Sequence, residues 1–183
     1  MHIDPQGWLD AAVRLASPHY NARPATDDIS LLVIHNISLP PGQHGARYIN
    51  ALFLGTLPAL RHDHPYLDSI ADLRVAAHFL ILRDGSIRQY VSTLDRAWHA
   101  GVSHYQGREN CNDFSIGIEL NGSDQQPYTL RQYQALARLT RAIIARHPRI
   151  TPTRISGHSD IAPGRKSDPG AAFNWHYFRT LLE

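Results

Sequence analysis

Cysteine is nearly absent from this sequence, since Cys111 is the only one among 183 residues. A single cysteine excludes an internal disulfide framework and any zinc site built from several thiolates. The chain also lacks an apolar run long enough to span a bilayer, and residues 1–8 contain neither a basic segment nor a continuous apolar one. These absences predict a cytoplasmic protein that does not insert into a membrane.

Runs of like charge are absent as well. The 18 Lys and Arg residues nearly balance the 16 Asp and Glu residues, and the small basic excess is spread along the chain. Nucleic-acid binding is not expected, because it requires a concentrated basic patch. With 43% hydrophobic residues in 183 positions, the chain is long enough for one core, and we expect a single domain over residues 1–183.

A compact apolar segment over residues 30–36 is typical of a buried central strand and ends abruptly at His35 and Asn36. In a sheet covered by helices, ligand sites form beyond the ends of the strands. His35 is therefore a candidate ligand that projects into a cleft. The alternative is a histidine whose hydrogen bonds are satisfied within the core.

Residues 114–121 indicate another strand, in which polar and apolar residues alternate. Glu119 shares a face with Ser115 and Gly117, whose small side chains leave space above that face. A carboxylate in such a position is costly unless it is paired or used. Glu119 is therefore a candidate functional group.

Turn and cap signals predict the remaining elements. We expect a short helix around residues 8–15 followed by an extended arm to residue 28, a helix over 46–54, a polar loop over 61–66, a hairpin of residues 75–82 and 87–91 around Asp84-Gly85, a helix from the Thr129 capping box to His147, a short strand over 153–156, and a terminal helix capped by Asn174.

A polar segment over residues 157–170 carries His158, Lys166 and Asp168 between glycines and prolines that favour an irregular backbone. A catalytic zinc site has three protein ligands and one open position, and zinc accepts histidine nitrogen and aspartate oxygen. His158 and Asp168 are thus candidates for two ligands, and the third must come from elsewhere. The alternative is that His158 caps a turn while Lys166 and Asp168 form a solvated ion pair.

Trp98 and His99 lie in a turn that places an indole beside an imidazole. One interpretation is that Trp98 forms a wall of a binding cleft. The other is that it is a buried aromatic anchor, and the sequence leaves both open.

Six segments of the chain resemble the zinc-dependent N-acetylmuramoyl-L-alanine amidases, a broad family that includes phage lysozyme-type amidases and peptidoglycan-recognition proteins. The resemblance covers nearly the whole chain and is strongest to the bacterial cytoplasmic 1,6-anhydro-N-acetylmuramyl-L-alanine amidases. Secreted and phage relatives usually have Cys and Tyr at the positions of Asp168 and Glu119. The segments are Ile34-His35-Asn36, Ala77-His78-Phe79, Arg96 to Gly101, Asn112 to Leu120, Gly157 to Pro163, and Lys166 to Gly170.

This resemblance implies an α/β fold in which helices flank a mixed central β-sheet, as in peptidoglycan-recognition proteins and phage lysozyme-like amidases. It implies that zinc is bound by His35, His158 and Asp168. With zinc in place, Glu119 would act as general base and then general acid, and Lys166 would stabilise the developing oxyanion.

The expected reaction is hydrolysis of the amide bond between the lactyl group of (1,6-anhydro-)N-acetylmuramic acid and L-alanine in muropeptides, in cell-wall recycling. By the same resemblance, Asn36, Arg74 and Trp98 match positions associated with substrate contact. The expected partner is this small-molecule muropeptide. Two rival hypotheses are a non-catalytic muropeptide-binding module and a zinc peptidase that cuts the peptide stem.

Overall fold

The computed structural model describes all 183 residues and contains a six-stranded central sheet with two small two-stranded sheets. The central strands, in spatial order, are β1 (Val13–Arg14), β5 (Ile87–Gln89), β4 (Phe79–Ile81), β9 (Ser115–Asn121), β3 (Leu31–Ile37) and β10 (Ile155–Gly157). The small sheets pair β2 (Tyr20–Asn21) with β6 (Arg96–Ala97) and β7 (His104–Tyr105) with β8 (Arg108–Glu109).

The central sheet is mixed because one of its pairings is antiparallel. The pairs β4–β9, β9–β3 and β3–β10 are parallel, whereas β4 and β5 form the antiparallel hairpin that Asp84-Gly85 predicts. The helices are α1 (Arg47–Phe53), α2 (Pro65–Ile70), α3 (Leu130–Arg146), α4 (His158–Ile161) and α5 (Trp175–Thr180), with short 3-10 helices η1 (Leu57–Asp63), η2 (Cys111–Asp113) and η3 (Pro152–Arg154).

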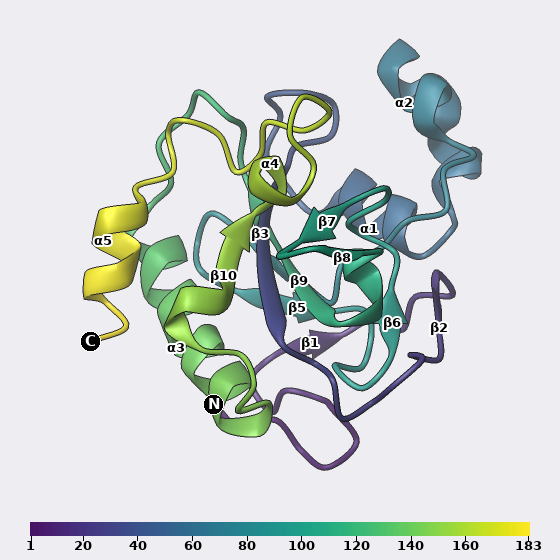
Figure 1. Cartoon of the computed structure of the whole chain (residues 1–183). Coiled ribbons are helices and arrows are strands. Elements are labelled where there is room, and N and C mark those ends of the chain that lie inside the picture. Colours follow the sequence, from purple (N-terminus) through teal and green to yellow (C-terminus); the bar gives the residue numbers. More distant parts are fainter.

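Helices cover both sides of the sheet, and Figure 1 shows α3 and α5 on one side with α1 and α2 on the other. The predicted fold class, a mixed sheet flanked by helices, is thus confirmed. None of these helices combines the length and the apolar character needed to cross a bilayer.

Alternation along β3 determines which side carries polar chemistry. Leu32 and Ile34 belong to the large core cluster that contains the apolar face of α3. Leu31 and Val33 point to the opposite face, and His35 follows them there at the same spacing of two. The face turned away from α3 is therefore the one that becomes polar as the strand ends.

The N-terminal segment differs from its prediction. Residues 8–15 form no helix: Ile3 bridges Leu9, and the chain then enters β1. The amide of Leu9 donates to Gln89 Oε1 at 2.7 Å, and the amide of Leu15 donates to the Gln89 carbonyl at 2.9 Å. Pairing with β5 uses the backbone groups that a helix would need.

Two predicted loops also contain regular structure. The segment over residues 61–66 is not a loop but the end of η1 and the start of α2, where the His64 ring accepts a hydrogen bond from the amide of Tyr66 at 3.0 Å. Pro65 then occupies the first helical turn, which its fixed φ favours. Likewise, the polar segment after β10 begins with the single turn α4, which starts at His158.

Helix α3 is bounded by the signals that predict it. Thr129 Oγ1 accepts from the amide of Gln132 at 3.1 Å, and Gln132 Oε1 accepts from the amide of Thr129 at 3.1 Å. At the other end the helix stops at Arg146, directly before His147 and the helix-breaking Pro148. The capping box therefore satisfies two amide groups that would otherwise lack partners.

We predict that Thr129→Ala lowers the free energy of unfolding by about 1–2 kcal/mol, because the cap is lost. The upper part of this range is expected, since Thr129 Oγ1 also donates to the Arg83 carbonyl at 2.7 Å. Chemical denaturation of the wild type, Thr129→Ala and Thr129→Ser measures the change. Serine keeps the hydroxyl and should retain most of the stability; equal stability of the alanine variant and the wild type would contradict this role.

Candidate active site

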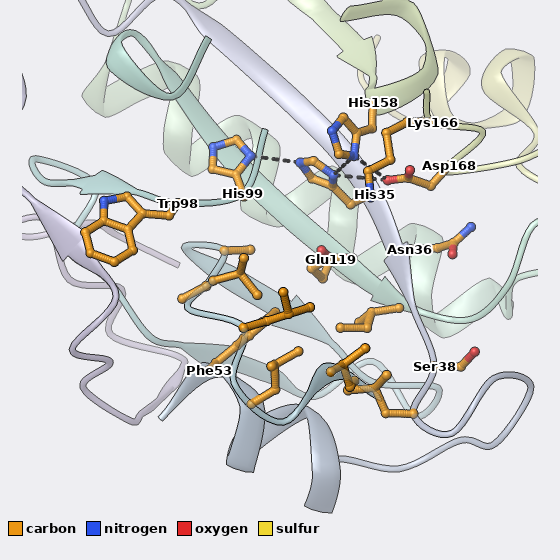
Figure 2. A pocket seen from close by; sticks show the side chains of 18 of the residues that line it. His35, Asn36, Ser38, Phe53, Trp98, His99, Glu119, His158, Lys166 and Asp168 are labelled. Carbon is orange, nitrogen blue, oxygen red and sulfur yellow. Dashed lines mark hydrogen bonds and ion pairs between the residues drawn. The ribbon is translucent and has the colours of Figure 1, made fainter. Parts of the chain in front are cut away.

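A cavity of about 380 Å³ lies between the sheet and the segments that follow β3, and its two walls differ in chemistry (Figure 2). The polar wall contains His35, His99, Glu119, His158, Lys166 and Asp168. The apolar wall contains Leu39, Leu52, Phe53, Ile70, Leu73 and Val75. A ligand in this cavity therefore meets titratable groups on one side and hydrocarbon on the other.

Three donor atoms converge at the polar wall. His35 Nδ1 is 2.9 Å from His158 Nδ1, and Asp168 Oδ2 is 3.1 Å from each of these nitrogens. Strand pairing explains the first of these distances. Gly157 on β10 pairs with Ile34 on β3, so the residues that follow them, His158 and His35, lie side by side. The neighbouring strand β3 thus brings His35, the candidate for the third ligand, next to the polar segment.

The contact made by the second ring nitrogen of His158 indicates which nitrogen of that ring carries the proton. His158 Nε2 lies 3.1 Å from the Ala100 carbonyl, which only accepts, so Nε2 carries the proton and the Nδ1 lone pair faces the centre. Burial lowers the pKa of His35 to about 4, which keeps this ring neutral near pH 7. Burial opposes ionisation of Asp168, but its close contacts with His158 and His35 hold the pKa of its carboxyl well below the usual range.

A small cation suits this donor set. Zinc–ligand distances of about 2.0–2.2 Å imply that two ligands of a tetrahedral ion are about 3.3 Å apart. The separations of 2.9–3.1 Å among His35, His158 and Asp168 are close to that value. Two imidazole nitrogens with one carboxylate oxygen also leave the open fourth position of a catalytic site.

Glu119 lies beside this triangle, in register with His35 across the β3–β9 pair. The residue is part-exposed in the cavity, but its Oε2 atom is buried and has no hydrogen-bond partner. Burial raises the pKa of the carboxyl well above its usual value; the negative charge of Asp168 acts in the same direction, and Lys166 opposes them. A buried oxygen without a partner is free to exchange a proton with a ligand.

Lys166 lines the same cavity from the loop that follows α4 (Figure 2). Asp168 forms its close contacts with His35 and His158 and not with Lys166, so the solvated ion pair considered for this loop is absent. The ammonium is therefore available to a ligand.

The three expected substrate contacts have different positions. Trp98 is half-buried and lines the cavity, and its Nε1 donates to Asn21 Oδ1 at 2.6 Å, which favours the cleft-wall interpretation. Asn36 also lines the cavity, but its amide donates to Asp124 Oδ1 at 2.7 Å. Arg74 is exposed and is not one of the lining residues.

Two parts of the site were missed by the sequence reasoning. The apolar wall comes mainly from α1, α2 and the segments beside them, and nothing in an apolar helical pattern distinguishes a cavity wall from core. His99 was recognised only as part of a turn, yet its Nδ1 lies 2.9 Å from His35 Nε2. The signal that was available is Gly117, which leaves the space that the His99 ring fills.

A site in which two histidines and an aspartate converge next to a glutamate whose buried oxygen lacks a hydrogen-bond partner is typical of metal-using hydrolases. Residues 25–171 match the N-acetylmuramoyl-L-alanine amidase family, and the chain belongs to that family.

Individual relatives agree with this assignment. The chain is 58% identical to the 1,6-anhydro-N-acetylmuramyl-L-alanine amidase AmpD of Citrobacter freundii, over 97% of this chain and 93% of the relative. A crystal structure of a selenomethionine AmpD derivative superposes with a TM-score of 0.95 at 57% identity and full coverage of both chains. The amidase AmiD of Escherichia coli, solved with anhydro-N-acetylmuramic acid-L-Ala-D-γ-Glu-L-Lys, has a TM-score of 0.64 at 31% identity and covers 88% of this chain and 60% of that one.

We predict that Asp168→Ala binds zinc much more weakly than the wild type, because the only carboxylate of the triangle is lost. Metal analysis after dialysis against a weak chelator measures this loss. Asp160→Asn is the matched control: its side chain accepts from the Gly157 amide at 2.8 Å and lies outside the triangle, so zinc should be retained. Full zinc occupancy in Asp168→Ala would remove Asp168 from the site.

Proposed function

We propose that this protein hydrolyses the amide bond between the lactyl group of (1,6-anhydro-)N-acetylmuramic acid and L-alanine in muropeptides, as a step in the recycling of cell-wall peptidoglycan. The observation that carries the proposal is the convergence of His35, His158 and Asp168 beside the unpartnered Glu119 carboxyl. The names of the relatives support the choice of amide, and the anhydro sugar peptide bound by AmiD supports the choice of substrate.

His35, His158 and Asp168 are the residues that would hold zinc. The two imidazole nitrogens and the carboxylate oxygen converge on one point, and metal binding requires the neutral imidazole and the ionised carboxylate. Zinc bound by these residues would act as a Lewis acid and would lower the pKa of a bound water toward neutrality.

Glu119 is proposed as the group that moves the proton. Its buried Oε2 accepts a proton from the attacking water, and the same oxygen then donates it to the departing amine of L-alanine. The raised pKa suits both steps, because a carboxyl that holds a proton more tightly is a better base before cleavage and still an acid afterwards.

Lys166 and the rest of the cavity are proposed to bind and orient the substrate. The Lys166 ammonium stabilises negative charge as it develops on the lactyl carbonyl oxygen. Trp98 and Asn36 line the cavity and are placed to contact the substrate, while Arg74 is exposed next to the lining residues Leu73 and Val75. We assign Arg74 to the outer part of a bound peptide stem, whose carboxylates would attract its charge.

Two broader expectations are part of the same proposal. Residues 1–183 form a single zinc amidase domain, supported by the one central sheet that both halves of the chain build. The protein acts in the cytoplasm, supported by the resemblance of Glu119 and Asp168 to the recycling branch. Cell fractionation followed by immunoblotting tests the location.

The decisive experiment is incubation of the zinc-loaded protein with an anhydro-muropeptide, followed by identification of the products by mass. The proposal expects anhydro-N-acetylmuramic acid and an intact stem peptide that begins with L-alanine. Cleavage within the stem would indicate a peptidase instead. Tight binding without any cleavage would indicate a recognition module.

We predict that Glu119→Gln lowers kcat by about 10²–10⁴-fold while zinc content and substrate binding remain. Folding raises the pKa of Glu119, so at any pH above the ordinary carboxyl range the buried charge opposes folding, and the neutral amide relieves this cost. The zinc-free variant should therefore be as stable as the wild type or slightly more stable near pH 7. A lower melting temperature with normal turnover per folded molecule would instead make Glu119 a structural acceptor.

We predict that Lys166→Ala lowers kcat by about 10²–10³-fold, the usual effect of losing one oxyanion donor. Zinc content should not change, since Lys166 is not part of the donor triangle. Steady-state kinetics with metal analysis on the same preparation measures both. Ser167→Ala is a control from the adjacent position, because this exposed side chain does not line the cavity. Wild-type turnover in Lys166→Ala would show that the ammonium takes no part in the reaction.

A further inference from the structure

His99 contacts the outer ring nitrogen of His35, Nε2, which faces away from the donor triangle of His35, His158 and Asp168. His99 Nδ1 lies 2.9 Å from His35 Nε2, a contact drawn as a dashed line in Figure 2. The two rings are nearly perpendicular, at 88°, with their centroids 5.0 Å apart. The other nitrogen of His99, Nε2, lies 3.2 Å from the hydroxyl of Ser115. His35 therefore faces the donor triangle with Nδ1 and faces His99 with Nε2.

The position of one proton decides whether His35 can bind a metal. A neutral imidazole carries its proton on one nitrogen only, so a lone pair on His35 Nδ1 requires the proton on Nε2. That proton is then donated to His99 Nδ1, and His99 carries its own proton on Nε2, from which it donates to Ser115 Oγ. In the reverse arrangement, His99 would donate to His35, and the His35 proton would point at the centre of the triangle.

The same turn supports both histidines of the triangle. The residue after His99 is Ala100, whose carbonyl accepts from His158 Nε2 at 3.1 Å. The side chain of Asn112 fixes this turn, because its Oδ1 accepts from the amides of His99 at 3.1 Å and Ala100 at 2.8 Å. Two adjacent residues thus provide acceptors for the outer nitrogens of His35 and His158.

The sheet leaves a space for the His99 ring. A Cβ atom at Gly117 would lie 2.5 Å from His99 Nδ1, closer than non-bonded atoms approach. Gly117 is paired with Val33 on β3, two residues before His35. Any side chain at this position would displace the atom that contacts His35.

We propose that His99 is a positioning residue: by accepting a hydrogen bond from His35 Nε2, it holds His35 in the tautomer that directs the Nδ1 lone pair at the metal. This rests on the proposed metal centre and deepens it. Outer hydrogen bonds of this kind orient a ligating histidine and raise its basicity, and their loss typically weakens metal binding about 10–100-fold.

The test compares two substitutions of His99. In His99→Asn, the side-chain Oδ1 replaces Nδ1 as an acceptor, because both atoms are at the δ position of the side chain. His99→Leu has comparable bulk and no acceptor. Competition with a chromophoric chelator gives the zinc dissociation constant of each protein. We expect His99→Leu to bind zinc about 10–100-fold more weakly than the wild type, and His99→Asn to recover most of the affinity.

A spectroscopic measurement separates positioning from general damage to the fold. In zinc-loaded wild-type protein, two-bond ¹H–¹⁵N correlation spectra should show His35 with its proton on Nε2 and a hydrogen-bonded shift. In His99→Leu, the His35 Nε2 signal should lose its hydrogen-bonded shift. The melting temperature of the zinc-free variant shows separately whether the fold persists. Gly117→Ala, which displaces His99 without removing it, should also weaken zinc binding.

The outcomes distinguish this proposal from the one on which it rests. Wild-type zinc affinity in His99→Leu would overturn the role of His99 and leave the metal centre intact. Equal losses in His99→Leu and His99→Asn would show that the ring acts by its shape and not as an acceptor, which also overturns the role. If the wild type itself bound no zinc, the metal centre would be wrong and the role of His99 would be refuted with it.

Discussion

The parallel register of β3 with its two neighbours is the constraint on which the site depends. Pairing with β9 sets Glu119 beside His35, and pairing with β10 sets His158 beside the same residue. A shift of one residue in either pair would turn the displaced side chains to the face that α3 covers. The sheet therefore positions His35 and Glu119 directly and His158 as the residue that follows β10, while Asp168 comes from a loop.

Burial shifts the pKa values of the ionisable groups in the cavity, and it also makes their charged forms costly. Near the ends of β3 and β9 the apolar core is replaced by polar residues, and the pKa values of the two carboxyls there shift in opposite directions. Asp168 is kept ionised by two imidazoles, while Glu119 has no partner for its buried oxygen and holds its proton more tightly. The pKa values of the two carboxyls in one cavity thus shift in opposite directions, because only Asp168 has imidazole rings in contact with it.

The sequence predicted the features that depend on local pattern. The strand that carries His35, the hairpin at Asp84-Gly85 and the capping box at Thr129 all follow from periodicity and turn chemistry, and the structure contains each, although the strand continues to Ile37. The helix expected at residues 8–15 was wrong because distant pairing with Gln89 uses its backbone. His99 was missed for a similar reason: its partner is 64 positions away, and only the fold brings the two rings together.

The central claim is that His35, His158 and Asp168 bind one zinc ion through the atoms that already converge. A crystal of the zinc-loaded protein, with anomalous diffraction recorded on both sides of the zinc absorption edge, tests it directly. The account predicts a single strong anomalous peak bonded to His35 Nδ1, His158 Nδ1 and a carboxylate oxygen of Asp168, with His35 Nε2 still facing His99. A peak elsewhere in the chain, or coordination that omits one of these three residues, would contradict it.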